Sequence, residues 1–541
     1  MRTQLLKFLI LLMACFPFLS GRAQEPVVAG NNNADTTRKV HILNNTRTLT
    51  FKTIDDSTRL TIVAGDVKMR QGTALIWCDS AVLNARTNMF EAWGKVHIRD
   101  ADTADIYANH LRYLGDERMA YLDGNVKLTD GKGTLTTPDL EYNMNTNLGI
   151  YKNGGRVVNE KTVLTSQEGW YYADMKDVYF KKNVRLNDPA YKINTDSMLY
   201  NTGTRSTRFI AQTRIEDTSG RVIDTKEGYY NQSTGEAYFG QRPIITDTRK
   251  RMRITGNNII QNDSINQITG NAVIIDSAQG TTLIGGIIIQ DKKTEAILAT
   301  RKPLLILQQD NDSIYITADT LYSARWTDRF GVDSVVVDSI TGEKRASFDP
   351  KDSTNRYFEA YSHVRIFNDS LQSVSDSLFY SLRDSVFRLY KDPVVWAQNS
   401  QITGDTILLY TKNKKADKIN AFENGYMISE VEPGVYNQIK SIRIDGWFLD
   451  GSIDSVRAMG FAECIYFIQE EDSSYTGVNQ STSDIIDIYF INKELDRVVL
   501  RNDVNGTIYP ANQRNPAEMK LPGFLWQEER RPKTRWVLEE R

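Results

Sequence analysis

The chain has 541 residues, enough for two to four domains or for one long array of repeats. Its 66 Lys and Arg against 68 Asp and Glu give a formal charge of −2, which argues against a nucleic-acid binder, a class that usually carries a clear basic excess. Only four His and three Cys occur, so few residues are available to form a His/Cys metal centre or a catalytic triad. With 26 Tyr and only 13 Pro, the composition favours a mostly β chain.

The N-terminus has the pattern of an export signal. Arg2 and Lys7 precede an apolar run that ends at Leu19, and Gly21-Arg22-Ala23 supplies the small residues of a cleavage site. The apolar run is too short to span a bilayer comfortably. We therefore expect a signal peptide over 1–23 and an exported protein, soluble or peripheral.

The three cysteines leave one alternative open. Leu12-Met13-Ala14-Cys15 also fits a lipobox with Cys15 acylated, but the apolar chain that follows it favours cleavage after Ala23. The other two, Cys78 and Cys464, lie far apart in the sequence. Export permits a disulfide between them, yet two small buried apolar side chains is the favoured interpretation.

An internal repeat of about thirty residues is the strongest signal. The pattern Gly-x-Val-x-Φ, in which Φ is a large apolar residue, begins at Gly65, Gly94 and Gly124, and degenerate copies begin at Lys182, Gly270 and Ser362. Val and Φ are two residues apart, so they share one face of a strand. We interpret the pattern as the opening of each repeat.

A second landmark follows each opening after about fifteen residues. It is an Asp-Ser or Asp-Thr pair before alternating apolar residues, as in 79–84 and 196–201, and a polar turn rich in Asn, Gly and Thr comes next. Each repeat is therefore expected to hold three or four short strands separated by polar turns. No segment of the body shows a convincing helical period.

The alternation predicts an all-β fold of two facing antiparallel sheets built from repeats of about thirty residues. Stacked repeats would align the Val and Φ residues on one apolar surface and the landmark residues on an opposing one. Sheets joined along one side leave a trough that an apolar ligand must cover, whereas the alternative is an ordinary sandwich with a closed core. The candidate groove residues are Val67, Met69, Leu83, Phe90, Val96, Ile98, Leu111, Tyr113, Val126, Leu128, Leu140, Tyr142, Met198 and Tyr200.

Basic residues occupy the other strand face. They are interpreted as a solvated outer surface, with phosphate contacts at a rim as the alternative for a minority: Lys68, Lys95, His97, Lys127 and Arg185.

The chain divides in sequence as follows. A polar leader (24–45) follows the signal peptide, a first repeat array covers 46–326, and residues 327–355 interrupt the rhythm as a loop insertion or linker. A second array covers 356–500, and 501–541 form a charged tail with several prolines, disordered or bound to a partner.

The signal peptide, the Gly-x-Val-x-Φ openings and the Asp-Ser/Thr landmarks together resemble the OstA-like (LptA-type) family of periplasmic lipopolysaccharide-transport proteins, over about 46–430. This chain looks like a long multi-repeat version, as in some Bacteroidetes-type exported proteins. The resemblance implies a repetitive, taco-shaped β-jellyroll whose interior holds the acyl chains of lipopolysaccharide. It implies a place in the periplasm of a Gram-negative cell, soluble or associated with the inner or outer membrane. It also implies end-to-end strand pairing with other jellyrolls of the transport machinery, or with further copies of the chain.

Motifs of catalysis are missing from the sequence. There is no phosphate-binding loop, nucleophile elbow or zinc-protease motif, and the four His share no ligand spacing. We expect no enzyme, no cofactor and no nucleic-acid partner. The alternative function is a structural β-repeat scaffold or adhesin with a closed core; an outer-membrane barrel is disfavoured because the region after 430 is short and charged.

Overall fold

The computed structural model describes residues 40–539, except for 45, 57, 72–73, 101–103, 130–132, 160, 202, 232, 309–312, 332–335, 338–343, 346–353, 413–414, 450, 470–474, 492–493 and 511–514. The predicted signal peptide, with its Cys15 alternative, and most of the polar leader lie outside these residues. The chain forms two compact units: unit 1 comprises 1–249 and 260–262, and unit 2 comprises 250–259 and 263–541.

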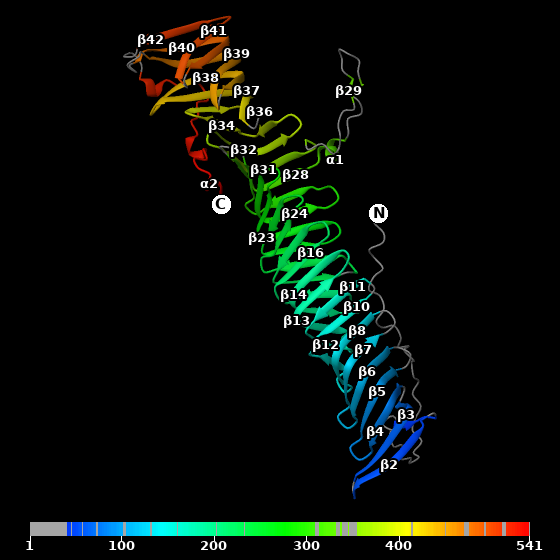
Figure 1. Ribbon diagram of the computed structural model, residues 1–541. Helices are drawn as coiled ribbons and strands as arrows, with labels where there is room; N and C mark the ends of the chain where they lie inside the picture. The colour runs from blue at the N-terminus through cyan, green and yellow to red at the C-terminus, as the bar shows by residue number, and fades with distance from the viewer. Residues whose placement is uncertain are drawn as a thin grey trace, which may run out of the picture. The chain divides into compact units, whose positions relative to one another are not determined.

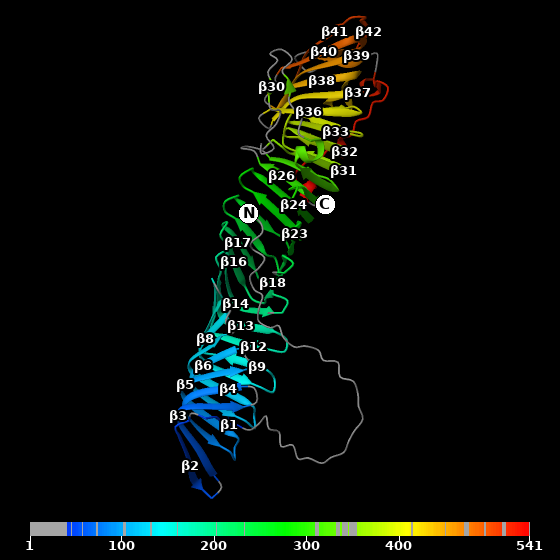
Figure 2. The same cartoon turned by 90° about the vertical axis from the view of Figure 1, so that its right-hand side faces the viewer.

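Unit 1 is built from antiparallel strands, each stacked on its neighbours (Figure 2). Its strands are β1 (Val40–Ile42), β2 (Thr48–Asp55), β3 (Thr58–Gln71), β4 (Ala74–Asn84), β5 (Met89–Asp100), β6 (Ala104–Leu114), β7 (Met119–Thr129), β8 (Gly133–Asn143), β9 (Leu148–Tyr151), β10 (Gly155–Asn159), β11 (Thr162–Ser166), β12 (Glu168–Tyr172), β13 (Asp177–Asn187), β14 (Tyr191–Asn201), β15 (Ser206–Phe209), β16 (Thr213–Asp217), β17 (Arg221–Thr225), β18 (Glu227–Asn231), β19 (Glu236–Gly240) and β20 (Ile244–Asp247).

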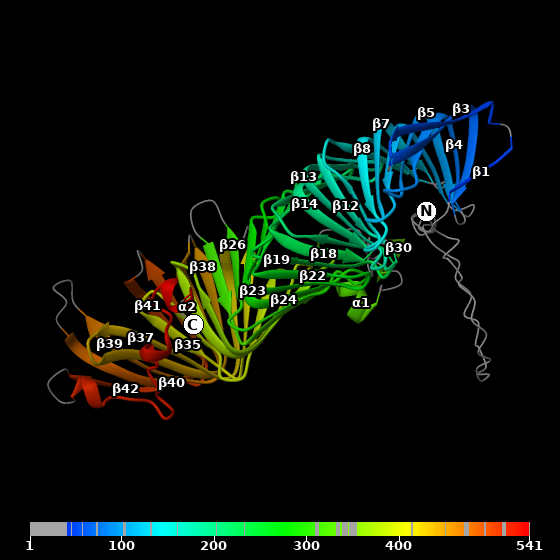
Figure 3. The ribbon, with the colours of Figure 1, turned by 90° about the horizontal axis from the view of Figure 1, so that it is seen from below.

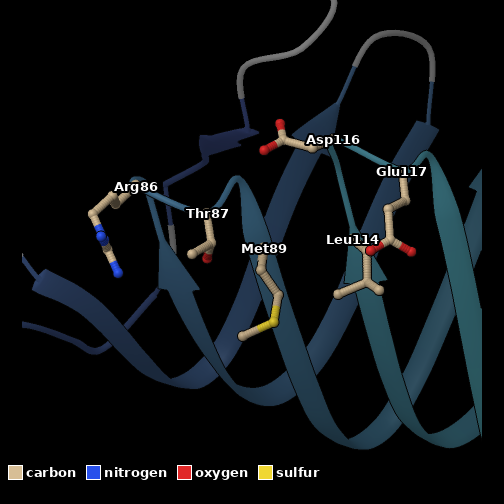
Figure 4. Close-up of a pocket in the computed structure, with 6 residues that line it drawn as sticks. All are labelled: Arg86, Thr87, Met89, Leu114, Asp116 and Glu117. Carbon is tan, nitrogen blue, oxygen red and sulfur yellow. The ribbon is translucent and has the colours of Figure 1, made fainter.

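A sharp bend divides the long strands of unit 1. In β5 the pairing with β6 shifts between Trp93 and Val96, and the two residues skipped, Gly94 and Lys95, have φ of 75° and 48°. Two consecutive left-handed residues form a bulge that turns the strand. Each strand therefore lies in two sheets, as the curved ribbons of Figure 4 show.

We call these two sheets wall A and wall B. Wall A contains the strand segments that carry Val67, Val96 and Val126, and wall B contains those that carry Ala81 and Leu111. The bends form the line along which the walls join.

The bend changes the interpretation of the repeat. The all-β fold is confirmed, but the Gly-x-Val-x-Φ pattern lies in the middle of a strand and does not open a repeat. From β3 to β8 each repeat contains two long bent strands, so the expected three or four short strands are wrong there. The same left-handed pair recurs without glycine at Lys182-Asn183 and Ser362-His363, which explains the degenerate copies.

The polar turns form as their composition predicts. The side-chain Oδ1 of Asn84 accepts hydrogen bonds from the backbone N–H of Arg86 (3.1 Å) and of Thr87 (3.3 Å). Asn143 and Asn201 make the equivalent pairs of bonds in later turns. Asn is therefore placed where its side chain replaces a backbone acceptor and closes the turn.

Unit 2 contains the remaining strands, except that the last two residues of β22 belong to unit 1. These are β21 (Met252–Thr255), β22 (Asn258–Gln261), β23 (Ile265–Asp276), β24 (Thr281–Asp291), β25 (Ile297–Thr300), β26 (Leu304–Gln308), β27 (Ser313–Thr317), β28 (Thr320–Ala324), β31 (Tyr357–Phe367), β32 (Leu371–Ser381), β33 (Val386–Tyr390), β34 (Val394–Ala397), β35 (Ser400–Thr403), β36 (Thr406–Lys412), β37 (Lys415–Glu432), β38 (Val435–Leu449), β39 (Ser452–Gln469), β40 (Tyr475–Ile491), β41 (Glu494–Arg501) and β42 (Asn505–Pro510).

The predicted insertion at 327–355 is described only in part. Helix α1 (Trp326–Phe330) begins it, and β29 (Val336–Val337) pairs with β30 (Lys344–Arg345). The predicted domain boundaries stay a prediction.

The C-terminal tail packs on unit 2. It contains the short helical turns η2 (Pro516–Glu518) and η3 (Glu528–Arg530) and the helix α2 (Trp536–Glu539). Figures 1 and 3 show it in red, crossing the strands of unit 2 beside β35 and β38.

Glutamine side chains hold the tail backbone. Gln401 donates through Nε2 to the carbonyl of Leu525 (2.8 Å) and accepts through Oε1 from the N–H of Gln527 (2.7 Å). Gln438 makes the same pair of bonds with Met519 and Leu521. Each glutamine amide thus bonds to the tail backbone through one donor and one acceptor, as the backbone of a neighbouring strand would. The described part of the tail therefore packs against other residues of the same chain.

Candidate functional site

The interior between the two walls of unit 1 is the candidate site. Val96 and Ile98 of wall A, and Phe90 and Ala92 of wall B, lie on the same side of one bent strand. Apolar side chains from both walls form a single cluster from β3 to β8. The apolar side chains of walls A and B therefore face each other in the structure.

The structure places twelve of the fourteen candidate groove residues in this cluster. Eight are buried: Val67, Met69, Phe90, Val96, Leu111, Tyr113, Val126 and Leu140. Four are half-buried: Leu83, Ile98, Leu128 and Tyr142. Met198, which is buried, and Tyr200, which is half-buried, lie further along unit 1 and outside the cluster.

Burial varies within the cluster. Val63 and Ala81, next to the bends, are 0% exposed, as is Ala92. Leu83 and Leu128, two to four residues further from the bend, are only half-buried. Met69 (0% exposed) and Phe90 (3% exposed) lie as far from the bends and are buried, so solvent reaches only some of the larger side chains.

Buried hydroxyls lie along the bends of the later repeats, and the sequence interpretation missed them. Thr137 Oγ1 donates to the carbonyl of Asp139 (3.0 Å), and Thr195 Oγ1 donates to that of Ser197 (3.2 Å). Ser166 and Thr225 make the same bond two residues ahead. A Thr or Ser just before a landmark, such as Thr195 before Asp196, was the available signal, because a bend leaves a buried carbonyl that needs a donor.

A hollow of about 380 Å³ lies elsewhere in unit 1. Figure 4 shows its lining at the turn end of wall B, where Met89 and Leu114 are joined by Arg86, Asp116 and Glu117. Met89 and Leu114 alternate with the inward Phe90 and Tyr113, so the hollow belongs to the outer surface. It is polar, open and separate from the interior.

Residues 37–196 match the family of OstA-like proteins. The chain carries an OstA-like segment. No curated protein matches the chain. Among solved structures, the chain is similar to LptH of Pseudomonas aeruginosa, described as the LptA-homologous periplasmic component of the lipopolysaccharide transport device. Identity is 16%, the match covers 26% of this chain and 95% of that one, and the TM-score is 0.21.

The OstA-like segment contains the whole apolar cluster from β3 to β8. Among the residues that the structure describes, no group of three His, Cys, Asp or Glu side chains could hold a metal ion. No helix in the same residues is long and apolar enough to cross a membrane.

The outer face of the OstA-like segment carries stacked side chains. The ring of His97 stacks on Trp77 (4.8 Å between centroids) and on Tyr107 (4.4 Å). Lys68 lies over the Trp77 ring and Lys127 over the Tyr107 ring. Lys95, Lys127 and Arg185 are exposed, whereas Lys68 and His97 are half-buried.

Both described cysteines are free and buried. Burial, helped by the nearby Asp79 carboxylate, raises the pKa of the Cys78 thiol to about 12, and burial raises the pKa of Cys464 to about 11. Because the thiolate is the reactive form, we expect neither to react with an aromatic disulfide reagent at pH 8 in the folded protein. Both should react in urea, and rapid labelling without denaturant would contradict the burial.

Proposed function

We propose that the chain is a periplasmic protein that binds lipopolysaccharide and shields its acyl chains between walls A and B during outer-membrane assembly. The observation that supports this function is the pair of facing apolar walls within the OstA-like segment. A long apolar interior between two walls that are joined at the bends suits a hydrocarbon chain better than any polar ligand.

The energetics fit this proposal. Burying one CH₂ contributes about 0.8 kcal/mol, so an acyl chain of about a dozen carbons gains roughly 10 kcal/mol. The half-buried Leu83, Ile98 and Leu128 are the side chains that such a chain contacts first. The walls are joined only along the bends, so a lipid enters by parting their free edges.

The first strands of unit 1 support the proposed pairing with another jellyroll. Strand β2 is exposed along its full length and pairs with β3. Leu49, Phe51 and Ile54 on this strand are 48%, 73% and 54% exposed. An exposed edge with apolar side chains is a surface for β-augmentation.

One observation favours the alternative of a closed structural scaffold. The residues beside the bends are almost fully buried without any ligand. In that function the free edges stay closed and no lipid reaches Leu83 or Leu128.

A photo-crosslinking experiment tests the proposal. A photoreactive residue at Leu83 or Leu128 is expected to attach to lipopolysaccharide in cells or in purified mixtures, because both point between the walls. Val82 is the matched control, since it is the apolar neighbour of Leu83 and points to the outer face. Equal labelling at positions 82 and 83, or none at 83 and 128, would contradict lipid binding and support the scaffold.

A further inference from the structure

A single file of basic residues crosses the outer face of wall A. Successive strand partners place Lys68 opposite Trp77, Trp77 opposite His97, His97 opposite Tyr107 and Tyr107 opposite Lys127. The same file continues through Thr136, Arg156, Thr165, Arg185, Asn194 and Arg214, and ends at Asp224. We call these positions the basic row.

The basic row follows the sequence repeat. Its basic positions recur every 29 or 30 residues, on every second strand: Lys68, His97, Lys127, Arg156, Arg185 and Arg214. Strands lie about 4.8 Å apart, so neighbouring cations are spaced by about 10 Å and the row is about 50 Å long. Two of the six are already paired with carboxylates: His97 Nε2 lies 2.6 Å from Asp105 Oδ1, and Arg214 pairs with Glu216 (2.7 Å) and Asp224 (3.1 Å). The positive charge that the row offers to a ligand is therefore carried by Lys68, Lys127, Arg156 and Arg185.

Neutral residues separate the cations. No carboxylate occupies the row before Asp224, and Thr136 and Asn194 are exposed between the basic side chains. The next file of wall A carries carboxylates of its own: Asp105 pairs with Arg99 (2.9 Å) and also with His97 of the row, and Glu216 lies opposite Lys192. Positive charge is thus concentrated along one line and is not spread over the wall.

The aromatic residues of the row are already engaged. Trp77, His97 and Tyr107 stack on one another, and lysines cover the two outer rings. Their faces therefore do not serve as apolar anchors for a lipid surface or as platforms for stacking. The row offers ammonium and guanidinium groups, together with hydroxyl and amide groups at Thr136, Thr165 and Asn194.

We propose that the basic row binds a linear acidic polysaccharide, a sugar chain with carboxylate or phosphate groups that lies across the strands. A line of cations one residue wide matches a linear polyanion, whereas a bilayer presents charge over a plane. The Thr and Asn side chains between the cations can hydrogen-bond to sugar hydroxyls. The site is on the outside of wall A and does not depend on the lipid between the walls.

The test uses polygalacturonate, with its fully methyl-esterified form as a probe of the same backbone without charge. The mature full-length chain should bind the acid form and not the ester, and binding should weaken steeply with salt. The variant K127Q/R156Q/R185Q should bind about tenfold or more weakly and depend less on salt, because exposed charge contacts are small but additive. Circular dichroism and size-exclusion chromatography check that each variant is folded.

The matched control is K95Q/R208Q/K226Q, which removes three exposed basic side chains of unit 1 that lie off the row. This control should bind like the wild type. Equal losses in both triple variants would mean that only net charge matters and would overturn the proposal. Row-dependent binding to vesicles of phosphatidylglycerol, with none to polygalacturonate, would overturn it in favour of a membrane. Crosslinking at Leu83 should be unchanged in the row variant, so the two proposals fail separately.

Discussion

Replacing Trp396 with Ala is expected to lower the free energy of unfolding of unit 2 by about 3–5 kcal/mol. Trp396 is 0% exposed and forms a cluster with Val374 and Val394. It lies opposite both Gln372 and Gln401 on the face of β34 that the C-terminal tail crosses. Loss of the indole leaves a cavity that the rigid strands cannot fill. Urea unfolding, followed by hydrogen exchange in β34 and β35, measures the effect.

The matched variant is Trp396→Phe. The indole Nε1 is buried without a hydrogen-bond partner in the structure, so its removal costs no bond, and a phenyl ring keeps most of the volume. We expect a loss of only about 1–2 kcal/mol. Similar losses for Phe and Ala would contradict the packing role.

Replacing Gly94 with Ala is expected to destabilise the first repeats by about 2–4 kcal/mol, the sum of a conformational and a steric cost. Gly94 has φ of +75°, and a Cβ there would lie 2.4 Å from Asp79 Oδ2. The left-handed conformation costs an L-residue about 1–2 kcal/mol, and displacing Asp79 adds a similar amount. The bend between the walls should loosen, and hydrogen exchange in β4, β5 and β6 should accelerate.

Gly154→Ala is the control for Gly94→Ala. Gly154 also has a positive φ, +95°, but a Cβ at this position would meet no other atom within 4 Å. Its substitution should therefore cost only the conformational part, about 1–2 kcal/mol. Equal effects at the two glycines would show that the approach of Asp79 does not matter.

Side-chain faces could be predicted from the sequence, but the number of strands could not. On either side of the bend the alternation along a strand is unbroken. The pattern therefore places Val67 and Met69 together on one apolar surface and Ala81 and Leu83 together on the opposing one, as the structure has them. Gly-Asp and Gly-Lys pairs usually mark a chain reversal, and only backbone torsions distinguish a bulge from a turn. The bend therefore looks, in sequence, like the start of a repeat.

Contacts between residues far apart in the chain could not be predicted from the sequence either. Gln401 binds the backbone 124 residues later, and no local pattern marks it as a partner of the tail. The charge and prolines of 501–541 suggest a tail that is disordered or bound to a partner, yet Leu521 and Leu538 are buried within unit 2. The basic residues lie on the outer face as predicted, but their alignment in a row depends on strand register, which a repeat length alone does not fix.

The bend in every long strand of the first repeats has a consequence for how such a molecule can grow. A whole repeat of 29 or 30 residues adds two strands and one complete slice of both walls, with each side chain still on its own face. A single-residue insertion on one side of a bend would instead turn the inward side chains outward, and the outward ones inward, up to the next turn. Gene duplication can therefore lengthen the molecule in steps of about 10 Å without redesigning its core.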